Sequence, residues 1–393
     1  MTAGILMLPM TCHDAIIVGG GPAGSTAAAL LAQAGFRVLL LEEKRMPREK
    51  LCGEFITPES FPTLSRLGVF DELIRQGAQQ IRRLSLITSQ GQVDGEMADI
   101  SRECDWAMSV SRARFDQTLF ERARSLGAEC REGIAVKQCA FNGEYPTGVD
   151  GIDLGTGRPV SFRSELVIDA SGRQSRLMLN RAERTAGRRG SRRYALKVHF
   201  ENVVDIDGRI ELFLFEHGYG GLSLIENGLA NLCFITTEEI VRRAGGDSMK
   251  VLEQTILTNP IARERLSKAV VSGNWLAAGP LSFGRRRLFR RNVIALGDAA
   301  GMIDPFTGTG MQIALRSAEI AVRAIIESAG SSRYIEEAAR RYSSYYEEEF
   351  GRRMAIAGAL RPVVFSPLAT RIAAKTLAAA PFLARPLMRA TRR

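Results

Sequence analysis

The stretch DAIIVGGGPAGSTAAALLAQAGFRVLLLEEK, which begins at Asp14, constrains the fold of this chain more than any other segment. An apolar run of β-forming residues is followed by glycines, then by an alanine-rich helical pattern that Gly35 closes, and then by a second apolar run. This order predicts a βαβ unit with two parallel strands. The chain is therefore expected to be an α/β protein.

Three glycines of this unit have the spacing of a dinucleotide-binding turn. Gly19, Gly21 and Gly24 form G-x-G-x-x-G between the strand and the helix, and Glu42 ends the next strand. The glycines let the backbone approach a diphosphate at the helix N-terminus, where the amide groups favour negative charge, while Glu42 is placed to bind a ribose diol. The predicted dinucleotide-binding residues are Gly19, Gly21, Pro22, Ala23, Gly24 and Glu42.

Length and cysteine usage narrow the class of protein. A chain of 393 residues with 45% apolar content exceeds the usual single-domain size, so two interlocked domains are expected. The six cysteines are scattered, with no CxxC pair and no Cys/His cluster, which argues against a disulfide framework and against a metal site. The first residues lack the basic n-region and the cleavage site of a signal peptide. These features predict a cytoplasmic protein without a metal.

The net charge of +10 is a property of one end of the chain. Seven of the 53 basic residues lie from Arg361 onward, where no acidic residue occurs, so the preceding 360 residues carry only +3. Nucleic acid is therefore not an expected partner. The tail interleaves cations with apolar residues, and Pro381 and Pro386 divide it. Two interpretations stay open: a peripheral membrane contact, or a terminal helix packed on the body with its charges in water.

The rest of the chain alternates between two kinds of pattern. Alternating apolar runs separated by turn residues over 194–235 are typical of one antiparallel sheet, whereas NVIALGDAA, from Asn292, returns to the buried-strand pattern of the start. Long helices are expected at about 310–326 and 332–351. The predicted division is a dinucleotide-binding domain in three parts, 11–80, 106–190 and 286–330, a second domain in two parts, 81–105 and 191–285, which is expected to bind the substrate, and a C-terminal helical region, 331–393.

Four ordered motifs carry a family resemblance. VIDASGRQSR from Val167 and VIALGDAAGMIDPFTGTGMQIAL from Val293 are similar to two motifs of the FAD-dependent monooxygenase and geranylgeranyl reductase superfamily, whose architecture is that of the aromatic hydroxylases. SVSRARFDQTLFERARSLGAE from Ser109 resembles the family's helix motif, and PREKLCGEFITPES from Pro47 resembles its KxCG loop. The resemblance implies a Rossmann-like FAD-binding domain of the glutathione-reductase and aromatic-hydroxylase type, interlocked with an antiparallel substrate sheet and followed by C-terminal helices.

The resemblance also implies roles for individual residues. Asp298, after Gly297, is expected to hold the ribityl chain of FAD, and the turn at Gly308 would direct the backbone amides of the following helix at the flavin, where negative charge accumulates on reduction. Arg112 is expected at the FAD phosphates or the flavin edge, and its neighbour Arg114 in solvent. The cofactor residues implied by the resemblance are Arg112, Asp169, Gly172, Gly297, Asp298, Gly308, Thr309, Gly310 and Met311.

Two residues are candidates for catalysis. Cys52 lies in the KxCG loop, which the family places near flavin and substrate, and is either a proton donor or nucleophile or a buried packing residue. Tyr219 lies in HGYGGLSLI, which corresponds to the reductases' YGWxFP-like signature and is a second candidate proton source. Gly221 takes the place of the tryptophan in that signature, so a reshaped cavity for a hydrophobic or aromatic small molecule is expected.

The resemblance leaves four functions open. The leading hypothesis is a monooxygenase that takes electrons from transiently docked NAD(P)H, adds molecular oxygen at flavin C4a and hydroxylates an aromatic or polyketide-like substrate. The alternative is a geranylgeranyl reductase-like enzyme that saturates a C=C bond. A flavin halogenase is less favoured because Trp106 and Trp275 lie outside the WxWxIP context of halogenases. A non-catalytic escort-type protein is the fourth. No oligomeric state follows from the sequence.

Overall fold

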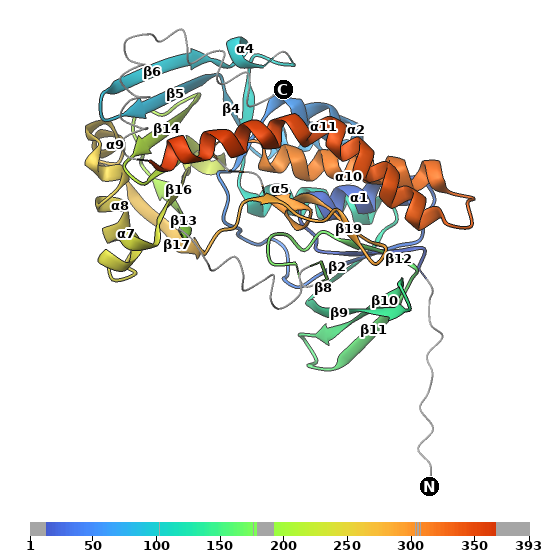
Figure 1. Ribbon diagram of the computed structural model, residues 1–393. Coiled ribbons are helices and arrows are strands. Elements are labelled where there is room, and N and C mark those ends of the chain that lie inside the picture. Colours follow the sequence, from blue (N-terminus) through green and yellow to red (C-terminus); the bar gives the residue numbers. More distant parts are fainter. Residues whose placement is uncertain are drawn as a thin grey trace.

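The chain folds around two sheets that share long helices between them (Figure 1). The structure is a computed structural model, and it describes residues 13–101, 103–175, 177–178, 192–302, 304, 306 and 308–366. In Figure 1, α10 (Gly310–Ser328) and α11 (Tyr334–Phe365) run side by side across the molecule, from the six-stranded sheet toward the seven-stranded sheet.

The first sheet has six strands that come from distant parts of the sequence. Its order is β19-β20-β12-β1-β2-β8, and all neighbours are parallel except β19 and β20. Its strands are β1 (Ala15–Val18), β2 (Val38–Glu42), β8 (Glu129–Glu132), β12 (Leu166–Asp169), β19 (Phe289–Arg290) and β20 (Val293–Ala295). The apolar runs of the sequence form its fully buried centre, as expected for a parallel sheet covered on both faces.

Helices and a small sheet cover this six-stranded sheet. Helix α1 (Pro22–Gln33) packs between α10 and α5 (Arg112–Ser125). A three-stranded antiparallel sheet contacts β2 and β12, and is formed by β9 (Ile134–Asn142), β10 (Tyr145–Asp153) and β11 (Pro159–Arg163). The βαβ unit is therefore completed by elements from far along the chain.

The second sheet has seven strands in the order β17-β13-β16-β15-β14-β5-β6. Its neighbours are antiparallel except β5 and β14, which pair in parallel. The strands are β5 (Arg83–Thr88), β6 (Gly91–Glu96), β13 (Arg193–Glu201), β14 (Arg209–Phe215), β15 (Gly218–Leu224), β16 (Ala230–Thr237) and β17 (Val270–Ala278). One face packs an apolar core against α7 (Glu238–Arg243), α8 (Ser248–Glu253) and α9 (Pro260–Arg265), and the other face turns toward the first sheet.

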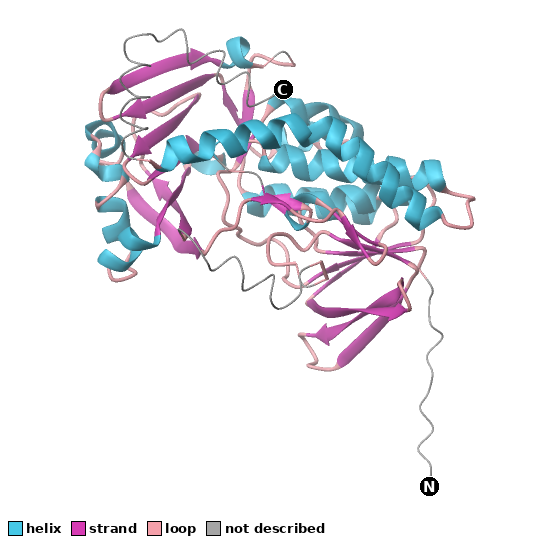
Figure 2. Cartoon of the chain, viewed as in Figure 1, coloured by secondary structure: helices cyan, strands magenta, loops and turns pink. Residues whose placement is uncertain are grey.

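Short elements join the two sheets (Figure 2). The short strands are β3 (Phe55–Ile56), β4 (Gln79–Ile81), β7 (Ala107–Ser109), β18 (Gly284–Arg285) and β21 (Gly301–Met302). The short helices are α2 (Phe61–Leu67), α3 (Phe70–Arg75), α4 (Met97–Ile100) and the 3-10 turns η1 (Pro58–Ser60), η2 (Glu226–Gly228), η3 (Ile256–Thr258) and η4 (Gly297–Ala299). The segment between β2 and β3 runs from the end of the six-stranded sheet to the face of the seven-stranded sheet that turns toward it, which is called the near face below.

The predicted fold class is confirmed: a mainly parallel α/β domain is interlocked with a largely antiparallel sheet. Helix α11 continues to Phe365, well past the expected end at residue 351. No helix within the described ranges is long and apolar enough to cross a membrane. The basic tail, for which a membrane contact and a packed terminal helix were both open interpretations, lies mostly in 367–393, outside the described residues, and so do the first twelve residues.

Substitution of Gly24 is expected to test the packing of the glycine turn. A Cβ at Gly24 would lie 1.9 Å from the Gly19 carbonyl oxygen, whereas one at Gly21 would find no atom closer than 3.7 Å. Gly24→Ala should therefore lower the free energy of unfolding of the cofactor-free protein by at least about 2 kcal/mol, measured by urea denaturation. Gly21→Ala is the matched control, and an equal loss in the control would contradict this account.

Candidate cofactor and substrate site

The glycine turn brings three segments into close contact. Gly19 has a φ of 106°, and a Cβ there would lie 2.5 Å from the Ala170 carbonyl oxygen, so only glycine fits between β1 and the loop after β12. The Gly20 amide donates a 2.7 Å hydrogen bond to Glu42 Oε2. Glu42 is buried at the end of β2, while Glu43 is exposed. Glu42 thus lies beside the turn, where the sequence expects the ribose.

Two arginines lie over the amino end of α1. Arg112 binds Asp116 through two 2.7 Å hydrogen bonds, and Arg48 binds the same carboxylate at 2.9 Å. A Cβ at Gly21 would lie 3.7 Å from one terminal nitrogen of Arg48 and 3.9 Å from one of Arg112. Burial opposes the charge of Arg112, but Asp116 and the Cys52 sulfur outweigh it and raise the pKa of Arg112. The helix end therefore faces two permanent cations.

Asp169 has a structural task in the loop after β12. Its carboxylate accepts hydrogen bonds from the Ser171 amide and hydroxyl and from the Ser175 hydroxyl. Burial raises the pKa of Asp169 in spite of these bonds. Gly172 follows with a φ of 84° and faces the Lys50 ammonium. Asp169 fixes the shape of the loop, and the position of Gly172 agrees with a place beside the cofactor.

The motif around Gly297 and Asp298 lies against the start of α1. Gly297 has a φ of 54°, and a Cβ there would lie 3.2 Å from Cβ of Ala23 in α1. Asp298 is partly exposed beside Gly297 and attracts Lys50, Arg173 and Arg286 electrostatically. The fold therefore brings Asp298 to the start of α1 at Pro22, which lies 276 positions earlier in the sequence.

The turn before α10 has the predicted shape. Gly308 has a φ of 67°, and a Cβ there would lie 3.3 Å from the Phe55 ring. Thr309 and Met311 are buried, while Gly310 at the first position of α10 is exposed. The amino end of this 19-residue helix is thus open next to β3.

Glu54 joins the half of the molecule that holds the glycine turn to the seven-stranded sheet. It is fully buried, and its Oε1 accepts hydrogen bonds from the Arg112 amide at 2.7 Å and from Lys197 Nζ at 2.5 Å. Its Oε2 lies 2.7 Å from Nε2 of His199, which is also on β13. Glu54 adopts a φ of 55°, which is uncommon for a side chain of this kind, so the surrounding contacts hold it there.

The two catalytic candidates, Cys52 and Tyr219, lie at the face of the seven-stranded sheet that turns toward the cofactor half. The Cys52 sulfur accepts the Glu54 amide at 3.4 Å and interacts with Arg112, while its carbonyl accepts Asn231 Nδ2 at 3.2 Å. The Tyr219 hydroxyl donates a 2.6 Å bond to Asp304, and burial, followed by Asp304, raises the pKa of Tyr219 well above its usual value. Both lie at the boundary between the two halves.

A row of residues crosses the near face of the sheet. Strand register places Lys197, Cys233, Gly221 and Leu212 side by side on four neighbouring strands. A Cβ at Gly221 would meet the side chains of Leu212 at 3.5 Å and Ile210 at 4.0 Å, which are ordinary contact distances. Gly221 therefore leaves local space on the face that turns toward the cofactor half, and the reshaped cavity stays a prediction.

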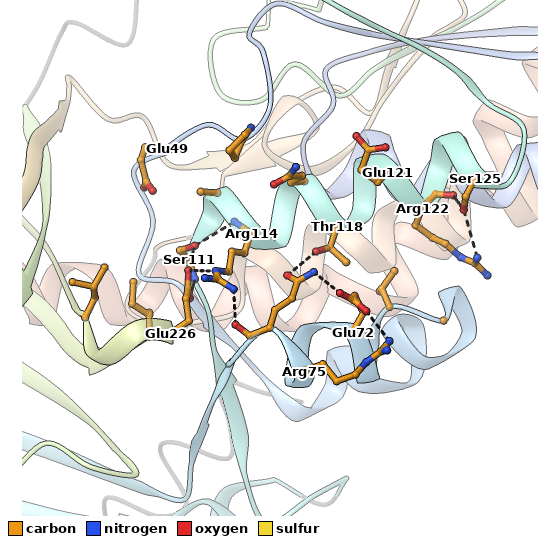
Figure 3. Close-up of a pocket in the computed structure, with 18 of the residues that line it drawn as sticks. Glu49, Glu72, Arg75, Ser111, Arg114, Thr118, Glu121, Arg122, Ser125 and Glu226 are labelled. Carbon is orange, nitrogen blue, oxygen red and sulfur yellow. Dashed lines mark hydrogen bonds and ion pairs between the residues drawn. The ribbon is translucent and has the colours of Figure 1, made fainter.

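A polar cavity opens beside Glu49 and His199, the neighbours of Glu54 that lie nearest to solvent (Figure 3). It has a volume of about 890 Å³ and is lined by residues of α3, α5 and the turn before β16. Figure 3 shows Arg114 directed at Glu226 in this cavity, and an ion pair of 3.1 Å joins them. The expectation of a solvated Arg114 was wrong, because its guanidinium also donates to the Gln76 carbonyl. Glu49 and His199 line this cavity and a smaller one beside β17.

One group of residues in the described part of the chain has the spacing of metal ligands: Glu49, Glu54 and His199. The Lys197 ammonium already lies among them, 2.7 Å from Glu49 and 2.5 Å from Glu54. Burial opposes this charge, but Glu54 and Glu49 raise the pKa of Lys197. Lys197 therefore supplies the positive charge that these carboxylates need.

Sequence reasoning missed Glu54, Lys197, Arg48 and Lys50. The motif PREKLCGEF contains three of the four, so their position beside Cys52 was a usable signal. No local sequence pattern could have identified Lys197 as a site residue. Only the strand register of β13 directs it toward Glu54, which lies 143 positions away.

Comparison with known proteins identifies the cofactor class. The sequence profile of the FAD binding domain family matches residues 13–333. The chain belongs to this family. Its residues fit FAD, because the open amino end of α1, the buried Arg48 Nε without a hydrogen-bond partner and the crowded cations above it call for an anion. Glu42, Arg112 and Asp298 border this region, and their roles toward the cofactor stay predictions.

The relatives include enzymes of different chemistry. Tryptophan 2-halogenase of Chondromyces crocatus is 27% identical over 79% of this chain, which spans only 60% of that relative. Digeranylgeranylglycerophospholipid reductase 2 of Methanopyrus kandleri is 29% identical, with 86% of this chain and 83% of the relative covered. The structure of the myxobacterial chondrochloren halogenase CndH has a TM-score of 0.74 and 26% identity, over 87% of this chain and 82% of that one. Halogenases, ranked low from the sequence, are thus prominent among the relatives.

Removal of the Glu54 carboxylate should strongly destabilise the protein. Glu54→Ala leaves Lys197, whose side chain is 2% exposed, without its closest partner, and a loss of about 3–5 kcal/mol in the free energy of unfolding is expected. Because the pKa of Lys197 is raised above 10.5, this contribution stays complete from neutral pH up to 10.5 and is lost only at higher pH, so urea denaturation near neutral pH measures it fully.

Glu49→Gln is the matched control, since Glu49 is 45% exposed and its ion pair with Lys197 is screened by water. It should cost less than about 1 kcal/mol. A Glu54→Ala variant as stable as Glu49→Gln would refute the assigned role of Glu54.

Proposed function

We propose that this protein is an FAD-dependent oxidoreductase that reduces a C=C bond of a hydrophobic substrate. The observation that supports it best is the group of acid–base residues at the boundary between the sheets, where Cys52, Glu54, Lys197 and His199 meet. Oxygen transfer to an aromatic ring needs little acid–base help from the protein, whereas addition of a hydride to one alkene carbon requires a proton for the other. This group moves the reductase ahead of the monooxygenase that the sequence favoured.

The chain's own residues supply the proton side of this reaction. FAD, held near Glu42, Arg112 and Asp298, would supply hydride transfer from NAD(P)H to the substrate. Each turnover consumes one proton from water. His199 lines both cavities and contacts Glu54, so this pair connects the cavities to the loop that carries Cys52. Cys52 is the proposed donor to substrate, and Tyr219, held by Asp304, positions the sheet against the loop before α10.

The reductase relative supports this proposal in two ways. It is 29% identical, and this chain covers 83% of its length, so no large domain separates the two. The halogenase relative is longer than this chain, which spans only 60% of it. In addition, Trp106 packs against Phe61 and Trp275 against Phe234, so both tryptophans lie within apolar packing away from the near face.

Oxygen-dependent chemistry is the second candidate. The 26–27% identity with two halogenases favours an enzyme that uses molecular oxygen, either to hydroxylate or to halogenate an aromatic substrate. NAD(P)H serves as a transient electron donor in both candidates. A cytoplasmic protein that contacts the membrane peripherally through its basic tail would suit a lipid substrate.

An anaerobic assay separates the two candidates. The FAD-loaded protein is incubated without oxygen with NADPH and a digeranylgeranylglycerophospholipid, and the lipid is analysed by mass spectrometry. The proposal predicts products that gain two hydrogen atoms per reduced bond. A lipid that stays unchanged, together with hydroxylated or brominated indole when oxygen and bromide are added, would contradict it.

Substitution of Cys52 should separate proton delivery from hydride transfer. Cys52→Ala is expected to lower the rate of alkene reduction by about 100-fold, since one general acid contributes about 10²–10⁴-fold. The rate of FAD reduction by NADPH, followed by loss of flavin absorbance in stopped flow, should change less than about twofold. Cys139→Ala is the control, because Cys139 lies on β9 away from the site. Equal loss of both rates would indicate a packing role for Cys52.

Gly221→Trp should narrow substrate selection without unfolding the sheet. The indole would fill space beside Leu212, so kcat/KM for a long isoprenoid substrate should fall at least about tenfold, with a smaller effect on a short one. Gly221→Ala should behave like the wild type. Equal kcat/KM values for Gly221→Trp and wild type would place the substrate elsewhere.

A further inference from the structure

The amino end of α1 faces more positive charge than its acidic neighbours neutralise. The guanidinium groups of Arg48 and Arg112 lie over Gly21 and share the carboxylate of Asp116. Arg48 also lies 3.4 Å from Glu42, but its Nε has no hydrogen-bond partner although it is buried. Two buried cations are thus held mainly by one aspartate.

Lys50 adds a third cation to the same place. Its Nζ would lie 3.5 Å from a Cβ at Gly172, so the ammonium is directed at the loop after β12, opposite α1. In the described ranges no side chain or carbonyl forms a hydrogen bond or ion pair with this ammonium. The charged groups that act on it are Arg48 of its own loop, Arg112 and Asp116 of α5, and Asp298 of η4.

Lys50 is anchored through its backbone and not through its side chain. The Lys50 carbonyl accepts a 3.3 Å hydrogen bond from Lys197 Nζ on β13, and Glu49 binds the same ammonium. The loop is therefore fixed to the substrate sheet at residues 49, 50 and 54. A substitution that shortens or neutralises the Lys50 side chain leaves this anchor in place.

We propose that Lys50 binds the diphosphate of the dinucleotide cofactor and, together with Arg48 and Arg112, forms a three-cation cradle over the amino end of α1. A diphosphate dianion satisfies the unpartnered ammonium, the unpartnered Arg48 Nε and the amides of the helix end at once. The loop that carries Cys52 is then held by the cofactor on one side and by Lys197 on the other.

Cofactor binding is expected to change the protonation of Lys50. Burial, with Arg112 and Arg48 nearby, lowers the pKa of Lys50 in the cofactor-free protein. A bound diphosphate favours the charged ammonium, so cofactor binding in alkaline buffer draws in a proton at Lys50. The Cys52 thiol, which faces Arg112, is removed as a source by using a Cys52→Ser background.

The test compares FAD with riboflavin, which lacks phosphate, by fluorescence titration of the cofactor-free protein. Lys50→Met should weaken FAD about 10- to 100-fold and riboflavin less than about twofold, as expected for the loss of one charged hydrogen bond. Lys44→Met, whose side chain is exposed on the same segment, is the matched control and should change neither. Lys50→Arg should retain most of the FAD affinity.

Calorimetry and thermal unfolding complete the experiment. Titration of FAD at about pH 9 in buffers of different ionisation enthalpy should record proton uptake in the Cys52→Ser background and less in its Lys50→Met derivative. Inorganic pyrophosphate should raise the unfolding temperature of the wild type more than that of Lys50→Met. The proposal is overturned if Lys50→Met binds FAD as the wild type does, if it loses FAD and riboflavin equally, or if proton uptake is unchanged.

Discussion

The contact between Glu54 and Lys197 is the constraint on which the rest of the structure depends. A fully buried carboxylate is stable only when every oxygen is matched by a donor, and here Lys197, His199 and the amide of Arg112 provide these donors. Glu54 sits on the loop that leaves the nucleotide strand β2, whereas Lys197 and His199 sit on the substrate sheet. The interaction therefore fixes the distance between the two functional halves.

The cofactor half is built to be completed by a long ligand. In the proposed arrangement, FAD would extend from Glu42 past the amino end of α1 to Asp298 and the turn before α10, which lies next to the seven-stranded sheet. These segments are dispersed in the sequence because a parallel sheet brings the ends of its strands to one edge whatever their order in the chain. The spacing between the early and the late glycine motif follows from this topology.

Local signals carried much of the prediction. The βαβ periodicity, the glycine spacing and the ends of α1 and α5 depend on neighbouring residues, and they could be read directly. The parallel pairing of β5 with β14, the extension of α11 to Phe365 and the ion pair of Arg114 depend on residues far apart, so no local pattern contained them. Ranking the halogenase low followed from an absent signature, yet overall similarity places halogenases among the relatives.

A double-mutant cycle on Glu54 and Lys197 tests the central claim most directly. The free energy of unfolding is measured for the wild type, Glu54→Gln, Lys197→Met and the double variant. If this contact joins the two halves, each single change leaves a buried group without its partner, and the double variant should lose at least about 2 kcal/mol less than the sum of the singles. Effects that add to within about 0.5 kcal/mol would contradict the account.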